Sequence, residues 1–286
     1  MVLRRRLISD LRRARARAGL TGTEVAKAVG WSTSKISRLE SGQTLPHKGD
    51  ITTLLDLYAV PEPKRTLLLE LVDLGSEPSW WDSYSDLITE GYSTYVGFEE
   101  AAARIYEWES MVIPGLLQTE DYARAIAAPW KDLMAHTPRQ AERGIALRME
   151  RQKILTRAEP VQYKTILDES VLRRTVGDKS IMREQLASLR RSCERPNVHI
   201  GIMLHERAIP FVAFSFSVLE FPEIGDLGEL HPEVAYSEDI RGGVIEEDEF
   251  QTYRYRRIFD QLYEAALTRE ESRDFITEME QRAAVS

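Results

Sequence analysis

Residues 20–46 constrain the fold of this chain most strongly, because they read as two short helices joined by a tight turn. Thr21 and Glu24 have the spacing of a capping box, in which each side chain satisfies a backbone N–H group at the start of a helix. Gly30 marks the turn that follows this helix. A glycine tolerates the backbone conformation that such a sharp change of direction requires.

The second helix of this segment begins after a cap at Ser32 or Thr33 and is predicted over about 33–41. Apolar residues lie on one face of each helix, at Val25, Ala26 and Val29 in the first and at Ile36 and Leu39 in the second. Two short helices that meet at a glycine-containing turn indicate a helix-turn-helix motif.

Three more helices are predicted around this motif. Residues 3–18 carry apolar side chains at helical spacing, and Gly19 ends that helix. Asp50 is positioned to cap a fourth helix, and a fifth follows Pro61 and Pro63 and closes at Gly75. We therefore expect residues 1–75 to form an N-terminal all-α five-helix bundle.

The rest of the chain has a different pattern. Residues 76–96 are rich in aromatic residues among Ser, Gly and Pro, and we expect an ordered connector whose rings pack on a neighbouring domain. Residues 97–286 mix helical and alternating patterns, which predicts a C-terminal α+β domain with a small sheet flanked by helices. The expected strands are 161–167, 198–204, 213–221 and 234–237, and the expected helices are 97–109, 119–128, 138–157, 179–192, 247–266 and 268–283.

Charge divides the chain unevenly. Residues 1–50 hold eleven Lys and Arg against four Asp and Glu, a net charge of +7, whereas residues 51–286 bring the total to −8 and therefore carry −15. This asymmetry indicates one module built for a polyanion and another that is kept away from it.

The second helix of the motif has the composition of a DNA-reading helix. A single helix fits the major groove of B-DNA, and its exposed N-terminal positions then face the bases. With Ile36 facing inward, Thr33, Ser34, Ser37 and Arg38 are free to reach base edges. The arginine runs at 4–6 and 12–13 are either a solvated face or a source of phosphate attraction, and we favour the second interpretation.

The segment also resembles the phage-repressor-like class of helix-turn-helix regulators. The matching positions are Leu20, Thr21, Val25, Ala26, Gly30, Ile36, Leu39, Glu40, Gly42 and Pro46. The resemblance implies that Thr33, Ser34 and Arg38 read bases, that Gln43 and Lys48 lie along the DNA backbone, and that Arg15 and Glu40 form a buried ion pair. Gly22 departs from the class, whose members often carry a phosphate-contacting glutamine there. We add Lys35 and Thr23 to the predicted DNA-binding residues.

The resemblance extends along most of the chain. Residues 80–126 are similar to the second domain of a large actinobacterial family of regulators with an antitoxin-like, WhiJ-like C-terminal domain. Residues 171–186, 194–200 and 253–276 match further blocks. The family implies a DNA operator as the main partner and a small acidic protein, encoded nearby, as a second one.

Nothing in the sequence indicates catalysis. The histidines at 47, 136, 199, 205 and 231 lack metal-ligand spacing, and a single cysteine, Cys193, cannot form an intrachain disulfide. We interpret Cys193 as structural or idle, although the neighbouring arginines could lower its pKa. Adjacent acids at 168–169 and 246–249 point to different faces and are expected to be solvated, and Gly242–Gly243 is interpreted as a turn. We expect no catalytic residue, no metal and no cofactor.

Two functional alternatives remain for the second domain. One is dimerisation and binding of the small protein partner, and the other is sensing of a small molecule. Amphipathic helices, notably 253–266, favour the first. Neither a signal-peptide core nor a run of about 18 apolar residues is present, so we expect a cytoplasmic homodimer that does not enter a membrane.

Overall fold

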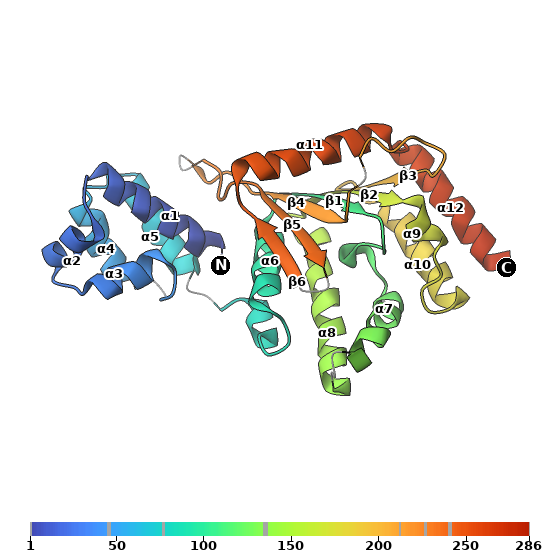
Figure 1. Cartoon of the computed structure of the whole chain (residues 1–286), viewed down its shortest axis with the longest axis horizontal. Coiled ribbons are helices and arrows are strands. Elements are labelled where there is room, and N and C mark those ends of the chain that lie inside the picture. The colour runs from blue at the N-terminus through green and yellow to red at the C-terminus, as the bar shows by residue number, and fades with distance from the viewer. Residues whose placement is uncertain are drawn as a thin grey trace. The chain divides into compact units, whose positions relative to one another are not determined.

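The computed structural model describes residues 2–44, 47–75, 78–133, 137–211, 213–225, 228–239 and 242–285. The chain divides into two compact units, which are described separately (Figure 1). Unit 1 comprises Met1–Asp82 and Pro222–His231, and unit 2 comprises Ser83–Phe221 and Pro232–Ser286. Among the positions discussed above, Pro46, His136 and the first two residues of the expected connector lie outside the described residues.

Unit 1 contains the five predicted helices, which confirms the all-α expectation. They are α1 (Val2–Arg17), α2 (Gly22–Val29), α3 (Thr33–Glu40), α4 (Lys48–Leu57) and α5 (Lys64–Gly75). Their apolar faces meet in one core in which Leu7, Leu11, Ile36, Ile51 and Leu68 are each at most 2% exposed. Because every helix contributes to this core, the bundle fixes the direction of α3 relative to its neighbours.

A distant segment completes unit 1. Ile224 packs against the core of the bundle, and the Arg6 guanidinium donates a hydrogen bond to the carbonyl oxygen of Glu229. Nothing in the local sequence pattern of residues 222–231 predicts this contact, because it depends on pairing across more than two hundred residues.

The start of α4 differs from the prediction. His47, not Asp50, is the N-cap, and its Nδ1 accepts a weak hydrogen bond from the Gly49 N–H at 3.4 Å. Asp50 lies inside the helix and its carboxylate accepts from Lys35 Nζ at 2.9 Å. The cap prediction was wrong because the carboxylate is used by an ion pair between helices.

The described part of unit 2 forms an α+β fold around a six-stranded mixed sheet, as predicted. The strands are β1 (Arg104–Glu109), β2 (Gln162–Asp168), β3 (Val198–Met203), β4 (Phe216–Glu220), β5 (Val234–Asp239) and β6 (Gly242–Glu246), in the order β3-β2-β1-β4-β5-β6. The pairs β1–β2 and β2–β3 are parallel, and the other three pairs are antiparallel.

Helices flank this sheet. They are α6 (Glu90–Ala101), α7 (Glu120–Leu133), α8 (Pro138–Arg151), α9 (Glu169–Arg173), α10 (Lys179–Ser192), α11 (Glu249–Ala265) and α12 (Arg269–Val285), with short 3-10 turns η1 (Trp80–Tyr84), η2 (Gly115–Leu117) and η3 (Gln152–Leu155). Figure 1 shows α11 running across one face of the sheet. Phe259 and Leu262 of α11 are buried there against Tyr106 and Trp108 of β1, so most of the predicted amphipathic stripe of this helix is core.

The predicted helix over 97–109 was wrong in its second half. The helix α6 ends at Ala101, and residues 104–109 form strand β1. The alanines of this stretch favour a helix locally, but Ile105, Tyr106 and Trp108 pair on both sides, with β2 and with β4. Tertiary pairing therefore overrides the local propensity.

Gly242–Gly243 is not a turn but the start of strand β6. A Cβ atom at Gly243 would lie 2.4 Å from Cε2 and Oη of Tyr236. Glycine is required here because the backbone of β6 approaches the Tyr236 ring closely.

Candidate nucleic-acid interface

The turn between α2 and α3 is held by local hydrogen bonds. Both predicted caps are present: Thr21 and Glu24 form the capping box of α2, and the Ser32 hydroxyl accepts from the Lys35 N–H. Gly30 has φ 69°, in the left-handed region, and its N–H donates to the Ala26 carbonyl. A residue with a side chain would be strained at this point, so Gly30 sets the angle between the two helices.

The inner face of α3 is anchored by packing and by an ion pair. Ile36 and Leu39 are each 2% exposed. Arg15 of α1 binds Glu40 through both ends of its guanidinium, with Nε–Oε1 and Nη2–Oε2 distances of 2.6 and 3.0 Å, and also donates to the Leu20 carbonyl at 2.9 Å. The hydrogen bond with Glu40 raises the pKa of Arg15. The predicted ion pair therefore ties α3 to α1.

The outer face of α3 carries the predicted base-reading residues. Thr33, Ser34, Ser37 and Arg38 are exposed. Positions three and four apart share one face of a helix, so these four side chains lie together and opposite Ile36. Arg38 forms no side-chain ion pair with any residue that the structure describes. Its guanidinium is thus available for a bidentate contact with a guanine.

The other predicted DNA-binding residues differ in their exposure and in whether they form ion pairs. Thr23 and Gln43 are exposed, on α2 and after α3 respectively. Lys35 is half-buried, because its Nζ binds Asp50 and lies 3.8 Å from the centre of the Trp31 ring. Lys48 is exposed, but its Nζ is 2.5 Å from Asp73. To contact a DNA phosphate, Lys35 would have to release Asp50 and Lys48 would have to release Asp73.

The arginines of α1 divide into two groups. Of the two arginine runs, Arg12 and Arg13 are exposed, as the phosphate-attraction interpretation requires, whereas Arg4 and Arg5 are half-buried. Arg6, in contrast, is buried and donates to Asp10 at 2.6 Å. For Arg6, both interpretations, a solvated face and phosphate attraction, were wrong.

Arg6 has a structural role through its ion pair with Asp10. The Asp10 residue is 1% exposed, and its carboxylate also accepts a hydrogen bond from Lys64 Nζ at 2.8 Å. Burial alone would raise the pKa of Asp10, but the hydrogen bonds from Lys64 and Arg6 outweigh burial and lower it. This buried cluster joins α1 to α5, so Arg6 supports the bundle.

Unit 2 buries charges that the sequence analysis did not single out. Arg151 of α8 binds both carboxylate oxygens of Glu99 of α6 at 2.7 Å, and Tyr95 donates to the same carboxylate at 3.0 Å. Burial would lower the pKa of Arg151, but Glu99 reverses this and raises it. The pair fixes α6 against α8, and no sequence spacing links residues 52 positions apart.

Two further carboxylates lie on strand β1. Glu107 accepts a hydrogen bond from the Tyr163 hydroxyl. Burial first, and then the neighbouring Glu109, raises the pKa of Glu107 to about 8. Burial also raises the pKa of Glu109 to about 7. Perturbed carboxylates are characteristic of functional sites, but they also occur in structural networks such as this one.

Two of the residues considered for catalysis have structural contacts. Glu169 was expected to be solvated, but it is buried, binds Arg173 and accepts from the His205 N–H at 2.9 Å. Burial raises the pKa of the Cys193 thiol to about 11, although Arg269 and Arg273 lower it. A thiol of this kind is protonated at neutral pH and is a poor nucleophile.

Within the described ranges, no group of three or more His, Cys, Asp or Glu could hold a metal ion. In the same part of the chain, the helices are either too short or too polar to cross a membrane.

The N-terminal geometry defines a class: a helix-turn-helix module, whose second helix is anchored on one face and polar or basic on the other. A helix-turn-helix domain family model matches residues 9–68. This match indicates DNA binding and a role in transcription regulation, and it points to a regulator rather than an enzyme.

A second family model, described as a domain of unknown function (DUF5753), matches residues 92–278. This match covers more than half of the chain, and the protein belongs to that family. A comparison with curated proteins finds no match for this sequence. The actinobacterial and antitoxin-like parts of the expected resemblance remain predictions.

Proposed function

We propose that this protein is a sequence-specific transcriptional regulator that binds operator DNA with α3 in the major groove. The observation that carries the proposal is the two-sided character of α3. Its inner face is held by the core and by Glu40, and its outer face presents Thr33, Ser34, Ser37 and Arg38. A rigid helix with free polar side chains is what direct reading of base edges requires.

Contacts to the DNA backbone follow from the same proposal. Thr23, Gln43 and Lys48 flank α3 in the chain, and Lys35 adds a cation on α3 itself. Phosphate contacts of this kind fix the register of the protein on the duplex but carry no sequence information. A regulator of this class acts where the DNA is, in the cytoplasm.

We propose that the protein binds as a homodimer. One short recognition helix covers few base pairs, and pairing two copies on an inverted repeat extends the site. Residues 83–221 and 232–286, which make up unit 2, carry a net charge of −8, and this acidic character supports a model in which unit 2 does not wrap DNA.

Unit 2 is proposed to mediate dimerisation and to bind a small protein partner. Phe250 and Tyr253, one turn apart on α11, are 66% and 58% exposed, and Phe214 is 94% exposed. Exposed aromatic side chains support a protein contact, because they lose little conformational entropy on burial. Calorimetry of the full chain with the small acidic protein encoded next to it tests this part, and the absence of binding heat would remove it.

The main proposal is tested by selection from a pool of random duplexes with the purified full chain. The expected result is one enriched inverted repeat whose half-sites are separated by about one helical turn, or a multiple of it. The double variant Thr33→Ala/Arg38→Ala should enrich no such sequence, whereas Arg183→Ala, which removes an exposed arginine from α10, should enrich the same repeat. A wild-type pool that stays random through every round would overturn the proposal.

A further inference from the structure

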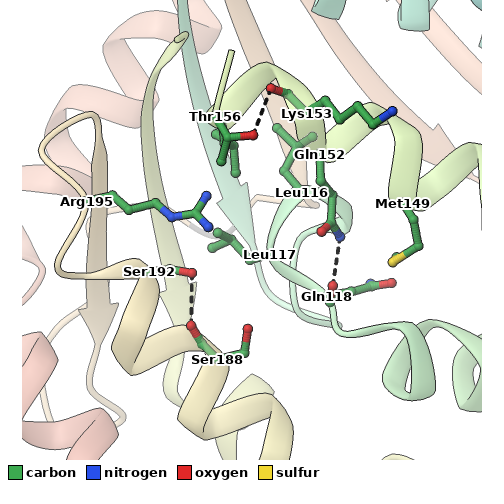
Figure 2. Close-up of a pocket in the computed structure, with 11 residues that line it drawn as sticks. Leu116, Leu117, Gln118, Met149, Gln152, Lys153, Thr156, Ser188, Ser192 and Arg195 are labelled. Carbon is green, nitrogen blue, oxygen red and sulfur yellow. Dashed lines mark hydrogen bonds between the residues drawn. The ribbon is translucent and has the colours of Figure 1, made fainter. Parts of the chain in front are cut away.

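Unit 2 contains a cavity of about 210 Å³ that the proposed function does not use. It lies between η2, the segment η3–Thr156 and the end of α10 (Figure 2). Leu116, Leu117 and Leu155 supply an apolar surface, and Ser188, Ser192 and Arg195 supply polar groups. The pocket is open to solvent on one side and is lined by both apolar and polar groups, and a concave site of mixed lining of this kind can hold a small molecule.

Three amide side chains, two of them buried, hold the backbone around this cavity. Gln185 donates to the Leu117 carbonyl at 2.8 Å, and Gln152 donates to the carbonyls of Gly115 and Gln118 at 2.9 and 2.7 Å. Asn197 donates to the Leu155 carbonyl at 3.2 Å. The walls are therefore fixed by directional hydrogen bonds from three separate elements, and a ligand would not have to order them on binding.

Arg195, an exposed residue, gives the open side of the cavity its charge. Its guanidinium points into the cavity toward Leu117 (Figure 2) and forms no ion pair with the residues described. Arg269 donates to the carbonyls of Cys193 and Arg195 at 2.9 and 2.7 Å, which holds the backbone that carries this side chain.

The charges around Arg195 favour one negative charge in a ligand. Lys153 also lines the cavity, but it extends away from the other lining side chains and its Nζ is 2.5 Å from Glu150. No carboxylate is among the lining residues. One unpaired guanidinium neutralises one negative charge, and its fork matches the two oxygens of a carboxylate.

The serine hydroxyls and the volume of the cavity further restrict the chemical class and the size of the ligand. Ser192 donates to the Ser188 carbonyl, which leaves the Ser192 oxygen as an acceptor, and the Ser188 hydroxyl has no partner among the described residues. The volume holds about seven water-sized groups. We propose that this cavity binds a small monocarboxylate whose head lies on Arg195 and Ser188 and whose short aliphatic chain lies on Leu116, Leu117 and Leu155.

Calorimetry of the full chain with hexanoate as the probe tests this site, with hexanol and hexylamine as matched compounds of the same chain length. Hexanoate should bind at least about tenfold more tightly than either, because only the carboxylate forms a charge-assisted pair with Arg195. The variant Arg195→Gln should lose about tenfold in hexanoate affinity. Arg183→Gln, which removes an exposed arginine of α10 outside the cavity, should bind hexanoate like the wild type.

A second variant tests whether hexanoate occupies this cavity by filling the cavity with a side chain. Ser188→Phe places a ring at the cavity and should abolish binding of hexanoate while leaving the circular dichroism spectrum unchanged, because Ser188 is only half-buried. The proposal is overturned if hexanoate gives no binding heat, if hexanol binds equally well, or if Arg195→Gln and Arg183→Gln have the same affinity. None of these outcomes depends on DNA binding, so failure of this proposal would leave the proposed DNA-binding function untouched, and the reverse also holds.

Discussion

The Arg15–Glu40 ion pair gives the sharpest test of how the helix-turn-helix is held together. We consider Glu40→Gln, which keeps the size of the side chain and removes its charge. Glu40 and Arg15 are 14% and 24% exposed at their side chains, so the pair lies between the surface and the interior. Breaking a fully buried pair costs about 3–5 kcal/mol, whereas an exposed pair contributes about 0–1 kcal/mol.

The expected loss follows from these two limits. Two charge-assisted bonds join the residues, and the glutamine oxygen can keep one of them as a weaker bond. Partial exposure screens the remaining charge on Arg15. We expect Glu40→Gln to lower the free energy of unfolding of unit 1 by about 2 kcal/mol.

Urea unfolding, followed through tryptophan fluorescence, measures this loss for Glu40→Gln, Arg15→Met and the double variant. Trp31 packs against the core of unit 1 and provides a local signal. The double variant should lose less than the sum of the two single losses, with a coupling of about 1–2 kcal/mol. Strictly additive losses, or a loss from Glu40→Gln below about 0.5 kcal/mol, would refute the view that this pair anchors α3.

Three other predictions concern pH, packing and assembly. The pKa of Glu107 is raised to about 8 in the folded state, so the wild type loses stability as pH rises from about 5 to about 8. Glu107→Gln removes this titration, and its Tm should therefore rise relative to the wild type over the same interval. A difference in Tm that does not change with pH would contradict this. Gly243→Ala should destabilise unit 2 by about 1–3 kcal/mol in chemical unfolding, because its Cβ would overlap the Tyr236 ring, whereas Gly144→Ala on α8 has open space and should not destabilise; equal effects would argue against this packing. Sedimentation of the full chain on an inverted repeat should give two copies per duplex, and one copy at saturation would exclude the homodimer.

The features that the sequence predicted correctly depend on short spacings. Thr21 and Glu24 are three residues apart, and Gly30 is adjacent to the helix it ends, so their hydrogen bonds are determined locally. The five helices of unit 1 follow from apolar residues at helical spacing, because each helix has only one face to bury. The Arg15–Glu40 pair came from the resemblance, since spacing alone does not connect α1 with α3.

The features that it missed depend on contacts between distant residues. Strand β1 looked helical because its pairing with β2 and β4 is not visible in residues 97–109 themselves. Gly243 looked like a turn because the Tyr236 ring that excludes a side chain is on another strand. Arg6 looked exposed because its contact with the Glu229 carbonyl, more than two hundred residues away, is not visible in the local sequence. For the DNA-binding surface, exposure of Thr33, Ser34, Ser37 and Arg38 agrees with the predicted roles, but their base contacts remain proposals.

The central claim is that α3 reads bases through Arg38. Its most direct test is the affinity of the full chain and of Arg38→Lys for the selected duplex and for a shuffled duplex, measured by fluorescence anisotropy at one salt concentration. Lysine keeps the charge but loses the planar fork, so it can still contact a phosphate. We predict that Arg38→Lys lowers the affinity for the selected duplex by about 1–3 kcal/mol, roughly 5- to 150-fold, and changes the affinity for the shuffled duplex little. Equal losses on both duplexes would show that Arg38 touches only the DNA backbone and would contradict the account.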